Sequence, residues 1–247
     1  MRLVIDIGNT RIKPAQESAG RLTSGPAIPW RDQSLEDALG AVCVGLPRPT
    51  AVLVSNVAGP SIGEALAARV AHHWQLVAEF MQVRPRCAGM QTIYDEPARL
   101  GVDRWLVALA GFHLAGGAVC VIDAGTALTV DIVTADGTHR GGLIAPGLAL
   151  MARSLTQGTA QLSLDTRTAV ERFATNTRDG ISLGCRDAVA GLLARVAERC
   201  KRDYGSLPRF IVTGGEAEEI LSLSPVALTH IPDLVHQGIV LAADAAS

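Results

Sequence analysis

Aromatic side chains and net charge are both scarce in this chain. Aromatic residues make up 4% of the 247 residues while hydrophobic residues reach 48%, so we expect a large aliphatic core. The formal net charge is only −2. Nucleic acid binding depends on a surplus of cationic side chains, so we expect no nucleic acid partner.

The chain also lacks the patterns of disulfide frameworks, zinc sites and membrane spans. Its five cysteines are an odd number and form no C-x-x-C pair, so we interpret them as buried thiols in a reducing cytoplasm. No run of about 18 apolar residues occurs. The apolar run 3–5 is cut by Asp6 too early for a signal peptide. We therefore expect a cytoplasmic protein with no membrane partner.

Common catalytic signatures are missing as well. Neither a Walker A pattern nor G-x-S-x-G occurs, which argues against P-loop chemistry and acyl transfer. The six histidines form no set with metal-ligand spacing, so we interpret them as surface or core residues.

What the chain does contain is a short unit that occurs twice. The units read Val4-Ile5-Asp6-Ile7-Gly8-Asn9-Thr10 and Val121-Ile122-Asp123-Ala124-Gly125-Thr126. In each, an apolar strand ends in Asp and is followed by a glycine turn and a hydroxyl residue. Glycine lets the backbone approach phosphate oxygens, and the carboxylate can hold a cation. Two such units suit a fold that holds a nucleoside triphosphate between two halves.

Apolar periodicity predicts that both halves have α/β structure. We assign residues 1–100 and 101–247 to the two halves, each a strand hairpin followed by alternating helices and strands. The predicted helices cover residues 35–44, 60–74, 103–114, 146–157, 178–203, 216–221 and 234–242. Residues 80–101 have no clear period and are predicted to form a long loop.

The first unit carries candidate metal and phosphate groups. Asp6 can hold Mg²⁺ near the β- and γ-phosphates, or it can simply cap the turn. Asn9 and Thr10 offer donors to phosphate oxygens. Lys13 falls on the following strand, on the same face as Arg11, where it can offset the charge of the transferring phosphoryl group. The alternative for Lys13 is a solvated surface position.

The second unit and a later glycine pair extend the nucleotide site. Thr126 can bind phosphate, and Asp123 can bind a second cation or cap its turn. Thr213-Gly214-Gly215 follows an apolar strand and precedes a helix. Its two glycines leave room for a ribose or a flat ring, which favours an adenosine site.

The segment Gly101-Val102-Asp103-Arg104 is the candidate for acceptor chemistry. Asp103, in the first turn of a predicted helix, can accept a proton from an attacking hydroxyl. Arg104 can hold a substrate carboxylate. The alternative is a charge pair at a helix N-terminus, where Asp is favoured by the helix dipole.

Four motifs together resemble type III pantothenate kinases, over residues 1 to about 243. They are Asp6-Ile7-Gly8-Asn9-Thr10-Arg11-Ile12-Lys13, Gly101-Val102-Asp103-Arg104-Trp105, Asp123-Ala124-Gly125-Thr126-Ala127 and Gly141-Gly142-Leu143-Ile144-Ala145-Pro146-Gly147. The resemblance implies the α/β, duplicated ribonuclease H-like fold of actin-like ATPases. It also implies ATP-dependent phosphorylation of pantothenate at its primary hydroxyl, the first committed step toward coenzyme A. Mg²⁺, a monovalent cation (K⁺ or NH₄⁺) and a homodimer are implied as well.

The resemblance further assigns roles by position. Asp103 is similar to the general base, Asp123 to the K⁺ ligand and Asp6 to a Mg²⁺ ligand. The residues similar to ATP contacts are Asp6, Gly8, Asn9, Thr10, Arg11, Lys13 and Thr126. The residues similar to pantothenate contacts are Tyr94, Gly101, Val102, Asp103, Arg104 and Thr177. For Thr177 the alternative is helix capping.

Three positions depart from the family pattern without removing a proposed catalytic group. Pro14 stands where an aromatic is frequent, so local strand pairing is expected to differ. Gly180 stands at a helical position and should cost about 1 kcal/mol of helix stability. Leu162-Ser163 replaces a frequent Leu-Pro.

Two alternative functions remain open. One is a nucleotide-binding accessory or regulatory protein that keeps the fold without kinase activity. The other is a kinase of the same superfamily that acts on a different small molecule. The presence of Asp6, Lys13, Asp103 and Asp123 favours an active enzyme.

Overall fold

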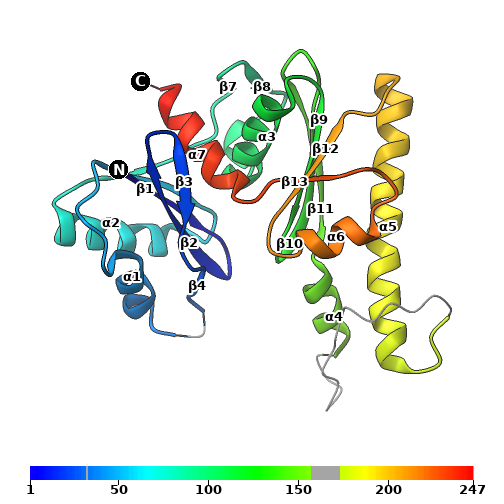
Figure 1. The fold of residues 1–247 in the computed structure, drawn as a ribbon, viewed down its shortest axis with the longest axis horizontal. Helices are drawn as coiled ribbons and strands as arrows, with labels where there is room; N and C mark the ends of the chain where they lie inside the picture. The colour runs from blue at the N-terminus through cyan, green and yellow to red at the C-terminus, as the bar shows by residue number, and fades with distance from the viewer. Residues whose placement is uncertain (32, 157–172, 247) are drawn as a thin grey trace. The chain divides into compact units, whose positions relative to one another are not determined.

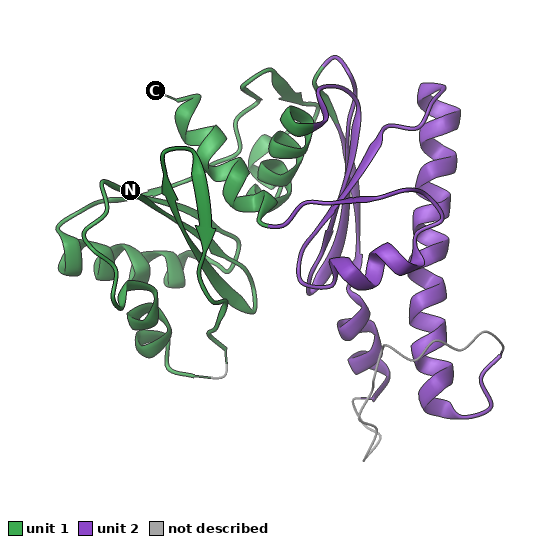
Figure 2. Cartoon of the chain, in the orientation of Figure 1, with its two compact units in different colours: residues 1–114, 137–139, 233–247 green, residues 115–136, 140–232 purple. Residues whose placement is uncertain are grey.

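The computed structural model describes residues 1–31, 33–156 and 173–246. The chain divides into two compact units, shown in Figure 2. Unit 1 comprises residues 1–114, 137–139 and 233–247, and unit 2 comprises residues 115–136 and 140–232. The Leu162-Ser163 departure and the predicted helix end at Gln157 lie outside the described residues. The predicted boundary between ribonuclease H-like halves, after residue 100, stays a prediction.

Unit 1 is built on a sheet in the order β3-β2-β1-β5-β6, with β4 paired to β2 (Figure 1). Its strands are β1 (Arg2–Ile7), β2 (Arg11–Ser18), β3 (Arg21–Ser24), β4 (Ile28–Pro29), β5 (Ala51–Asn56) and β6 (Ala78–Phe80). β1 is antiparallel to β2 and parallel to β5. The register with β1 continues through Pro14, opposite Ile5, so the expected change in pairing with β1 is not seen.

Helices pack on both faces of this sheet, α1 (Leu35–Cys43) and α2 (Pro60–Trp74) on one and α7 (Leu234–Asp244) on the other. α3 (Val102–Ala115) lies against α7, where a Cβ on Gly238 would be 2.3 Å from the Leu106 carbonyl oxygen. Leu3, Ile5 and Ile7 alternate along β1 and pack with α1 and α2 in one apolar cluster. α7 packs against β1 and β5. The intervening β1 side chains, including Asp6, therefore lie on the other face of the sheet.

The predicted loop at residues 80–101 is partly wrong. This stretch carries β7 (Arg86–Cys87), β8 (Met90–Thr92) and a 3₁₀ turn, η1 (Pro97–Arg99). β8 pairs with Thr138 and His139, which are remote in sequence. Within the described residues, β7 pairs only with β8, across a tight turn at Ala88-Gly89. Strands of two or three residues are too short to show the alternation that predicts a strand.

Unit 2 repeats the arrangement, in the order β13-β12-β9-β10-β11. Its strands are β9 (Val119–Ala124), β10 (Ala127–Val133), β11 (Thr138–Pro146), β12 (Arg209–Thr213) and β13 (Thr229–His230), and its helices are α4 (Leu148–Thr156), α5 (Thr177–Tyr204) and α6 (Ala217–Leu223). β9 is antiparallel to β10 and parallel to β12, as β1 is to β2 and β5. The architectural duplication predicted from the sequence is therefore confirmed.

The core of unit 2 lies between its sheet and the long helix α5, coloured yellow at its centre in Figure 1. Cys120 and Ile122 of β9 pack there with Val189 and Leu193 of α5. α5 begins after the N-cap Asn176 and ends at Gly205, which has a φ of 76°. Gly180 lies in its first turns and donates its N–H to the Asn176 carbonyl at 3.0 Å.

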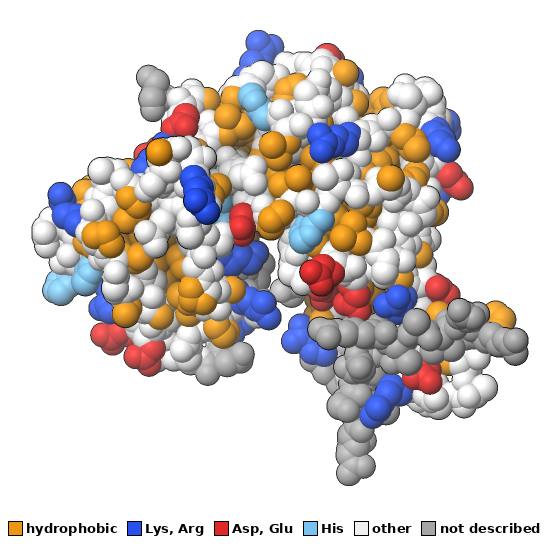
Figure 3. Space-filling model, in the orientation of Figure 1, with side chains coloured by type: hydrophobic (Ala, Val, Ile, Leu, Met, Phe, Trp, Pro, Cys, Tyr) orange, Lys and Arg blue, Asp and Glu red, His pale blue; other side chains and the backbone are white. Residues whose placement is uncertain are grey.

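All five cysteines are buried, as predicted. Burial raises the pKa of each thiol, and that of Cys120 lies well above its usual range. On the face shown in Figure 3, acidic and basic side chains are interspersed over each unit. Within the described part of the chain, no helix combines the length and hydropathy that crossing a membrane requires.

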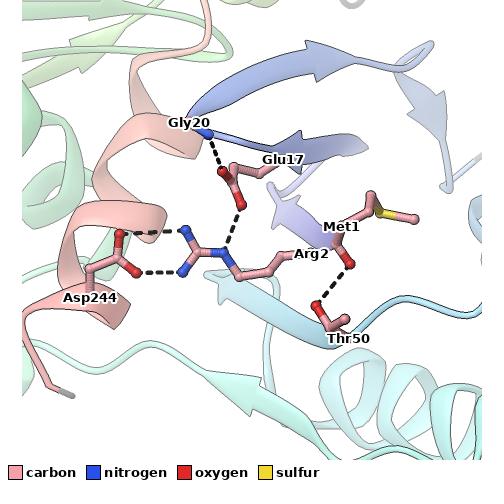
Figure 4. A network of polar contacts seen from close by, with 6 residues as sticks. All are labelled: Met1, Arg2, Glu17, Gly20, Thr50 and Asp244. Carbon is pink, nitrogen blue, oxygen red and sulfur yellow. Dashed lines mark hydrogen bonds and ion pairs between the residues drawn. The ribbon is translucent and has the colours of Figure 1, made fainter.

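A polar network joins the last helix to the first strands within unit 1 (Figure 4). The Arg2 guanidinium donates to both Asp244 carboxylate oxygens and, through Nε at 2.8 Å, to Glu17. Gly20 N donates to the other Glu17 oxygen at 2.8 Å. These hydrogen bonds, with that from Arg2 dominant, lower the pKa of Glu17.

Candidate active site

The first candidate element is the turn between β1 and β2. Gly8 N donates to the Arg11 carbonyl at 3.0 Å and closes the turn. Trp30 Nε1 donates to the Gly8 carbonyl at 2.9 Å, and Arg31 Nε donates to the Asn9 carbonyl. No local sequence pattern indicated Trp30 and Arg31, because they reach the turn from a segment 22 residues away.

Asp6, the residue before the last of β1, lies in an environment that suits a bound cation. Its side chain is buried, and Oδ2 lies 3.5 Å from Lys13 Nζ. Its other oxygen, Oδ1, is buried with no hydrogen-bond partner among the described residues, and so is the hydroxyl of Ser55. Ser55 stands opposite Asp6 on β5, so both side chains project from the same face. Buried polar atoms are nearly always satisfied, so these oxygens fit a site for a hard cation or its water ligands.

Lys13 is held by the last helix of the chain. His236 of α7 is buried, and its Nε2 donates to the Lys13 carbonyl at 2.9 Å. This contact fixes the backbone of Lys13 while its side chain remains about 41% exposed. The ammonium group is therefore available to a ligand as well as to Asp6.

A second cluster in unit 1 surrounds the start of α3. Asp103 lies in the first turn, and its Oδ1 accepts from Arg104 N at 2.7 Å. A Cβ on Gly101 would lie 2.7 Å from that oxygen, so glycine leaves room for the carboxylate. Arg104 is buried, and its Nη1 donates to the Tyr94 hydroxyl at 3.4 Å. Tyr94, Gly101, Asp103 and Arg104, all predicted as site residues, thus lie together.

In unit 2, three predicted segments converge on the turn after β9. Gly125 N donates to the Ala127 carbonyl at 3.0 Å, the counterpart of the Gly8 contact. Gly147 N donates to the Thr126 carbonyl at 3.0 Å. A Cβ on Gly147 would lie 2.0 Å from the Gly125 carbonyl oxygen. The last position of the fourth motif therefore has room only for glycine.

The Gly214 loop approaches the same strand end. Gly214 has a φ of 96°, and a Cβ there would lie 2.5 Å from Asp123 Oδ1 and 2.3 Å from the Ala124 carbonyl oxygen. Thr129, opposite Asp123 on β10, has a buried hydroxyl with no hydrogen-bond partner among the described residues. The hydroxyl and carboxylate oxygens of this pair fit a cation with oxygen ligands.

Glu216 is a structural member of this site that the sequence reasoning missed. Its carboxylate accepts from Leu148 N at 2.9 Å and Ala149 N at 3.1 Å, which caps the start of α4. Its own N–H donates to the Ala124 carbonyl at 2.9 Å. Gly147, which precedes α4, has no side chain that could cap the helix. This glycine was the sequence feature that could have indicated a capping carboxylate from another segment.

Thr177 is the first residue of α5 and is exposed. The capping role falls to Asn176, whose Oδ1 accepts from Asp179 N at 2.9 Å. The Thr177 hydroxyl is therefore not required for the cap, which removes the alternative explanation for this residue.

The duplicated sheet topology defines the class of protein, because it is the arrangement of the actin-like ATPases. A Campylobacter jejuni protein described as a Baf family transcriptional activator superposes with a TM-score of 0.61 at 22% identity, covering 96% of this chain and 94% of that one. Component A of (R)-2-hydroxyglutaryl-CoA dehydratase from Acidaminococcus fermentans superposes with a TM-score of 0.56 at 14% identity, covering 100% and 99%. At these identities the likeness concerns the fold alone.

Sequence comparison defines the family. The family model for type III pantothenate kinase matches residues 2–199. A type III pantothenate kinase from Nitrosococcus oceani is 35% identical over 246 residues, covering 97% of this chain and 92% of the relative. One from Azoarcus sp. is 37% identical, covering 100% and 92%. The chain belongs to the type III pantothenate kinase family, whose members are kinases of coenzyme A biosynthesis with ATP as co-substrate.

Proposed function

We propose that this chain transfers the γ-phosphoryl group of ATP to the primary hydroxyl of pantothenate, with the residues assigned below. The observation that carries the assignment is the duplicated strand–turn–strand unit, in which each central strand has a carboxylate, Asp6 or Asp123, one residue before its end. In-line attack by the hydroxyl oxygen forms the new P–O bond, and ADP leaves as the bond to its bridging oxygen breaks.

The two turns supply the phosphate contacts. The first turn offers backbone N–H groups and side chains of Gly8, Asn9, Thr10 and Arg11. Thr126 offers the corresponding donor in unit 2. Lys13, whose side chain is partly exposed, stabilises the charge that develops on the transferring phosphoryl group.

Asp6 is the residue we assign to Mg²⁺. Asp6 Oδ1 and the Ser55 hydroxyl, both buried without a hydrogen-bond partner in the described part of the chain, support this assignment. A divalent ion held there would neutralise phosphate charge and orient the β- and γ-phosphates. Lys13 Nζ, 3.5 Å from the other carboxylate oxygen, helps to hold the Asp6 side chain in position.

Asp123 is the residue we assign to the monovalent cation, K⁺ or NH₄⁺. Its carboxylate and the Thr129 hydroxyl, which has no hydrogen-bond partner among the residues described, support this choice, since both offer oxygen ligands. The Gly214 loop lies against the same carboxylate and limits its motion. Such a cation would help to place the nucleotide.

Pantothenate is assigned to the cluster at the start of α3. The Arg104 guanidinium binds its carboxylate, while Tyr94, Gly101, Val102 and Thr177 supply further contacts. Asp103, half-buried and fixed by Arg104 N, accepts the proton of the attacking hydroxyl. We also propose that the enzyme acts as a homodimer in the cytoplasm, on the strength of its family resemblance and its five buried thiols.

The test is ATP turnover with and without pantothenate, in K⁺ and then in Na⁺ buffer, with ADP and 4′-phosphopantothenate both quantified. We expect equal amounts of the two products, dependence on pantothenate, and faster turnover in K⁺. ATP binding without turnover would favour the accessory-protein alternative. Turnover with another acceptor only would favour a different small-molecule kinase.

A further inference from the structure

His139 is a buried polar residue that none of the sequence motifs includes. It lies near the start of β11, two residues before Gly141, and its side chain has no exposed surface. Residues 137–139 group with unit 1, whereas the rest of β11 belongs to unit 2. This short segment therefore places His139 among the residues of the Tyr94 cluster.

The backbone of this segment anchors the strand that leads to Tyr94. Gln91 N donates to the Gly137 carbonyl at 2.9 Å, and Ile93 N donates to the His139 carbonyl at 3.3 Å. Gly137 has a φ of 79°, and a Cβ there would lie 2.2 Å from the Gly89 carbonyl oxygen. The two strands are therefore held closely, with His139 opposite Thr92.

The side chain of His139 contacts Tyr94 in two ways. Its ring stacks on the Tyr94 ring, with centroids 5.9 Å apart and planes at 11°. Its Nδ1 is hydrogen-bonded at 3.2 Å to Thr92 Oγ1, which accepts from Tyr94 N at 3.3 Å. One imidazole thus orients both the ring and the backbone of Tyr94.

The chain of contacts continues to Arg104, since the Tyr94 hydroxyl accepts from Arg104 Nη1. Asp103 is held differently, by the backbone N–H of Arg104 at the start of α3. Loss of His139 should therefore disturb Tyr94 and the Arg104 side chain and leave the Asp103 carboxylate in place. Loss of His139 should therefore weaken binding of the acceptor and leave the rate of the chemical step nearly unchanged.

We propose that His139 is a positioning residue that holds Tyr94, and through it the Arg104 guanidinium, in the orientation that receives pantothenate. This inference rests on the proposed function, because it takes pantothenate as the ligand of that cluster. In this role His139 affects the affinity for pantothenate without contacting either pantothenate or ATP.

The kinetic test compares His139→Ala, His139→Phe and the matched control Thr138→Val. The control removes a similar buried hydrogen bond, from Gln91 Nε2 to Thr138 Oγ1 at 3.2 Å, one residue along the same strand pair. For His139→Ala we expect the pantothenate KM to rise about tenfold with kcat within about twofold. His139→Phe keeps the ring stack, so its KM should rise about threefold. Thr138→Val should match the wild type.

A second readout does not depend on activity. The chain has two tyrosines, Tyr94 and Tyr204, so ring-¹³C-labelled tyrosine gives one probe at the site and one internal reference. We expect both His139 variants to shift the Tyr94 signal and leave the Tyr204 signal unchanged. His139→Phe keeps a planar aromatic ring in the buried site, without the large cavity of His139→Ala, and serves if His139→Ala does not fold.

The outcomes separate the two proposals. Absence of pantothenate turnover in the wild type would overturn the proposed function. Normal wild-type turnover with unchanged KM and an unmoved Tyr94 signal in both His139 variants would overturn the role of His139. Equal KM increases in His139→Ala and Thr138→Val would also overturn it, because they would indicate a general effect of the strand pair.

Discussion

At the scale of single residues, two carboxylates of unit 1 differ sharply in their surroundings. Asp6 is buried beside a lysine and keeps one oxygen without a hydrogen bond among the described residues. Asp103 is half-buried, at a helix start, with one oxygen held by a backbone N–H. The first environment suits a cation ligand, and the second suits a group that contacts a substrate hydroxyl.

Asp103→Asn tests this division at the residue scale. The amide keeps the size of the carboxylate and cannot accept the hydroxyl proton, so we expect kcat to fall by about 10²- to 10⁴-fold. The ATP dissociation constant, measured by calorimetry, should stay within about threefold, because a general base adds little to ground-state binding. Asp187→Asn, at an exposed position of α5, is the matched control. Near-normal turnover of Asp103→Asn would remove Asp103 from its role.

At the scale of secondary structure elements, glycines set how closely strand ends and loops approach. Gly147 and Gly214 both lie where a Cβ would be within 2.5 Å of a backbone oxygen. Gly215, next to Gly214, meets nothing within 4 Å. The structure therefore leaves no room for a side chain at Gly214 but leaves room for one at Gly215, a difference that the sequence does not reveal.

Substitution of these neighbours separates the two effects. Gly214→Ala combines a left-handed φ with a clash against the Ala124 carbonyl, so we expect a loss of about 2 kcal/mol or more in the free energy of unfolding. Gly215→Ala should change it by less than about 1 kcal/mol. Urea denaturation followed by circular dichroism measures both. Equal losses would contradict the assigned geometry.

The network that joins α7 to β1 and β2 predicts a dependence of stability on pH. Arg2 and the Gly20 N–H lower the pKa of Glu17, so the native state binds its proton less readily than the unfolded chain. Its stabilisation is present above the unfolded pKa of Glu and is lost as pH falls through the lower, folded value. Glu17→Gln should therefore lower stability at neutral pH and reduce the loss on acidification.

The control for this prediction is Glu198→Gln. Glu198 pairs with Arg195 at 2.9 Å, but both side chains are mostly exposed, so the pair contributes little. Urea midpoints between about pH 3 and pH 7 cover the range in which carboxylates titrate. The same acid dependence in Glu17→Gln and the wild type would show that the network does not act through Glu17.

At the scale of the whole molecule, the family resemblance predicts a dimer. We expect light scattering coupled to size-exclusion chromatography to give the mass of two chains of 25.8 kDa at micromolar concentration. Dilution should lower the mass and the pantothenate turnover together if the acceptor site needs both subunits. A mass of one chain at full specific activity would contradict the dimer.

Most secondary structure was predictable because it follows from local patterns. The apolar runs before Asp6 and Asp123 predicted both central strands, and the periods over α2 and α5 predicted those helices to within a residue or so. Asp103 was placed correctly in the first turn of α3. These assignments depend on side-chain alternation and helix signals that neighbouring residues carry by themselves.

The site residues that the sequence did not reveal act across long separations. Trp30 and Arg31 contact the first turn, Glu216 caps α4, and His139 orients Tyr94. Each belongs to a segment remote from its partner, and no local periodicity signals such a pairing. The short strands β7 and β8 were missed because two or three residues cannot show alternation, and β8 also has a remote partner.

The sequence by itself determined the duplicated units, the family and the identity of the carboxylates, because each depends on residue order within a short segment. Only the tertiary structure decided which oxygens remain unsatisfied beside Asp6, which glycines tolerate no side chain, and how residues 137–139 come to lie against Tyr94. Those properties arise from contacts between segments far apart in the chain. The strength of these contacts depends on burial and on the distances between atoms, and folding sets both.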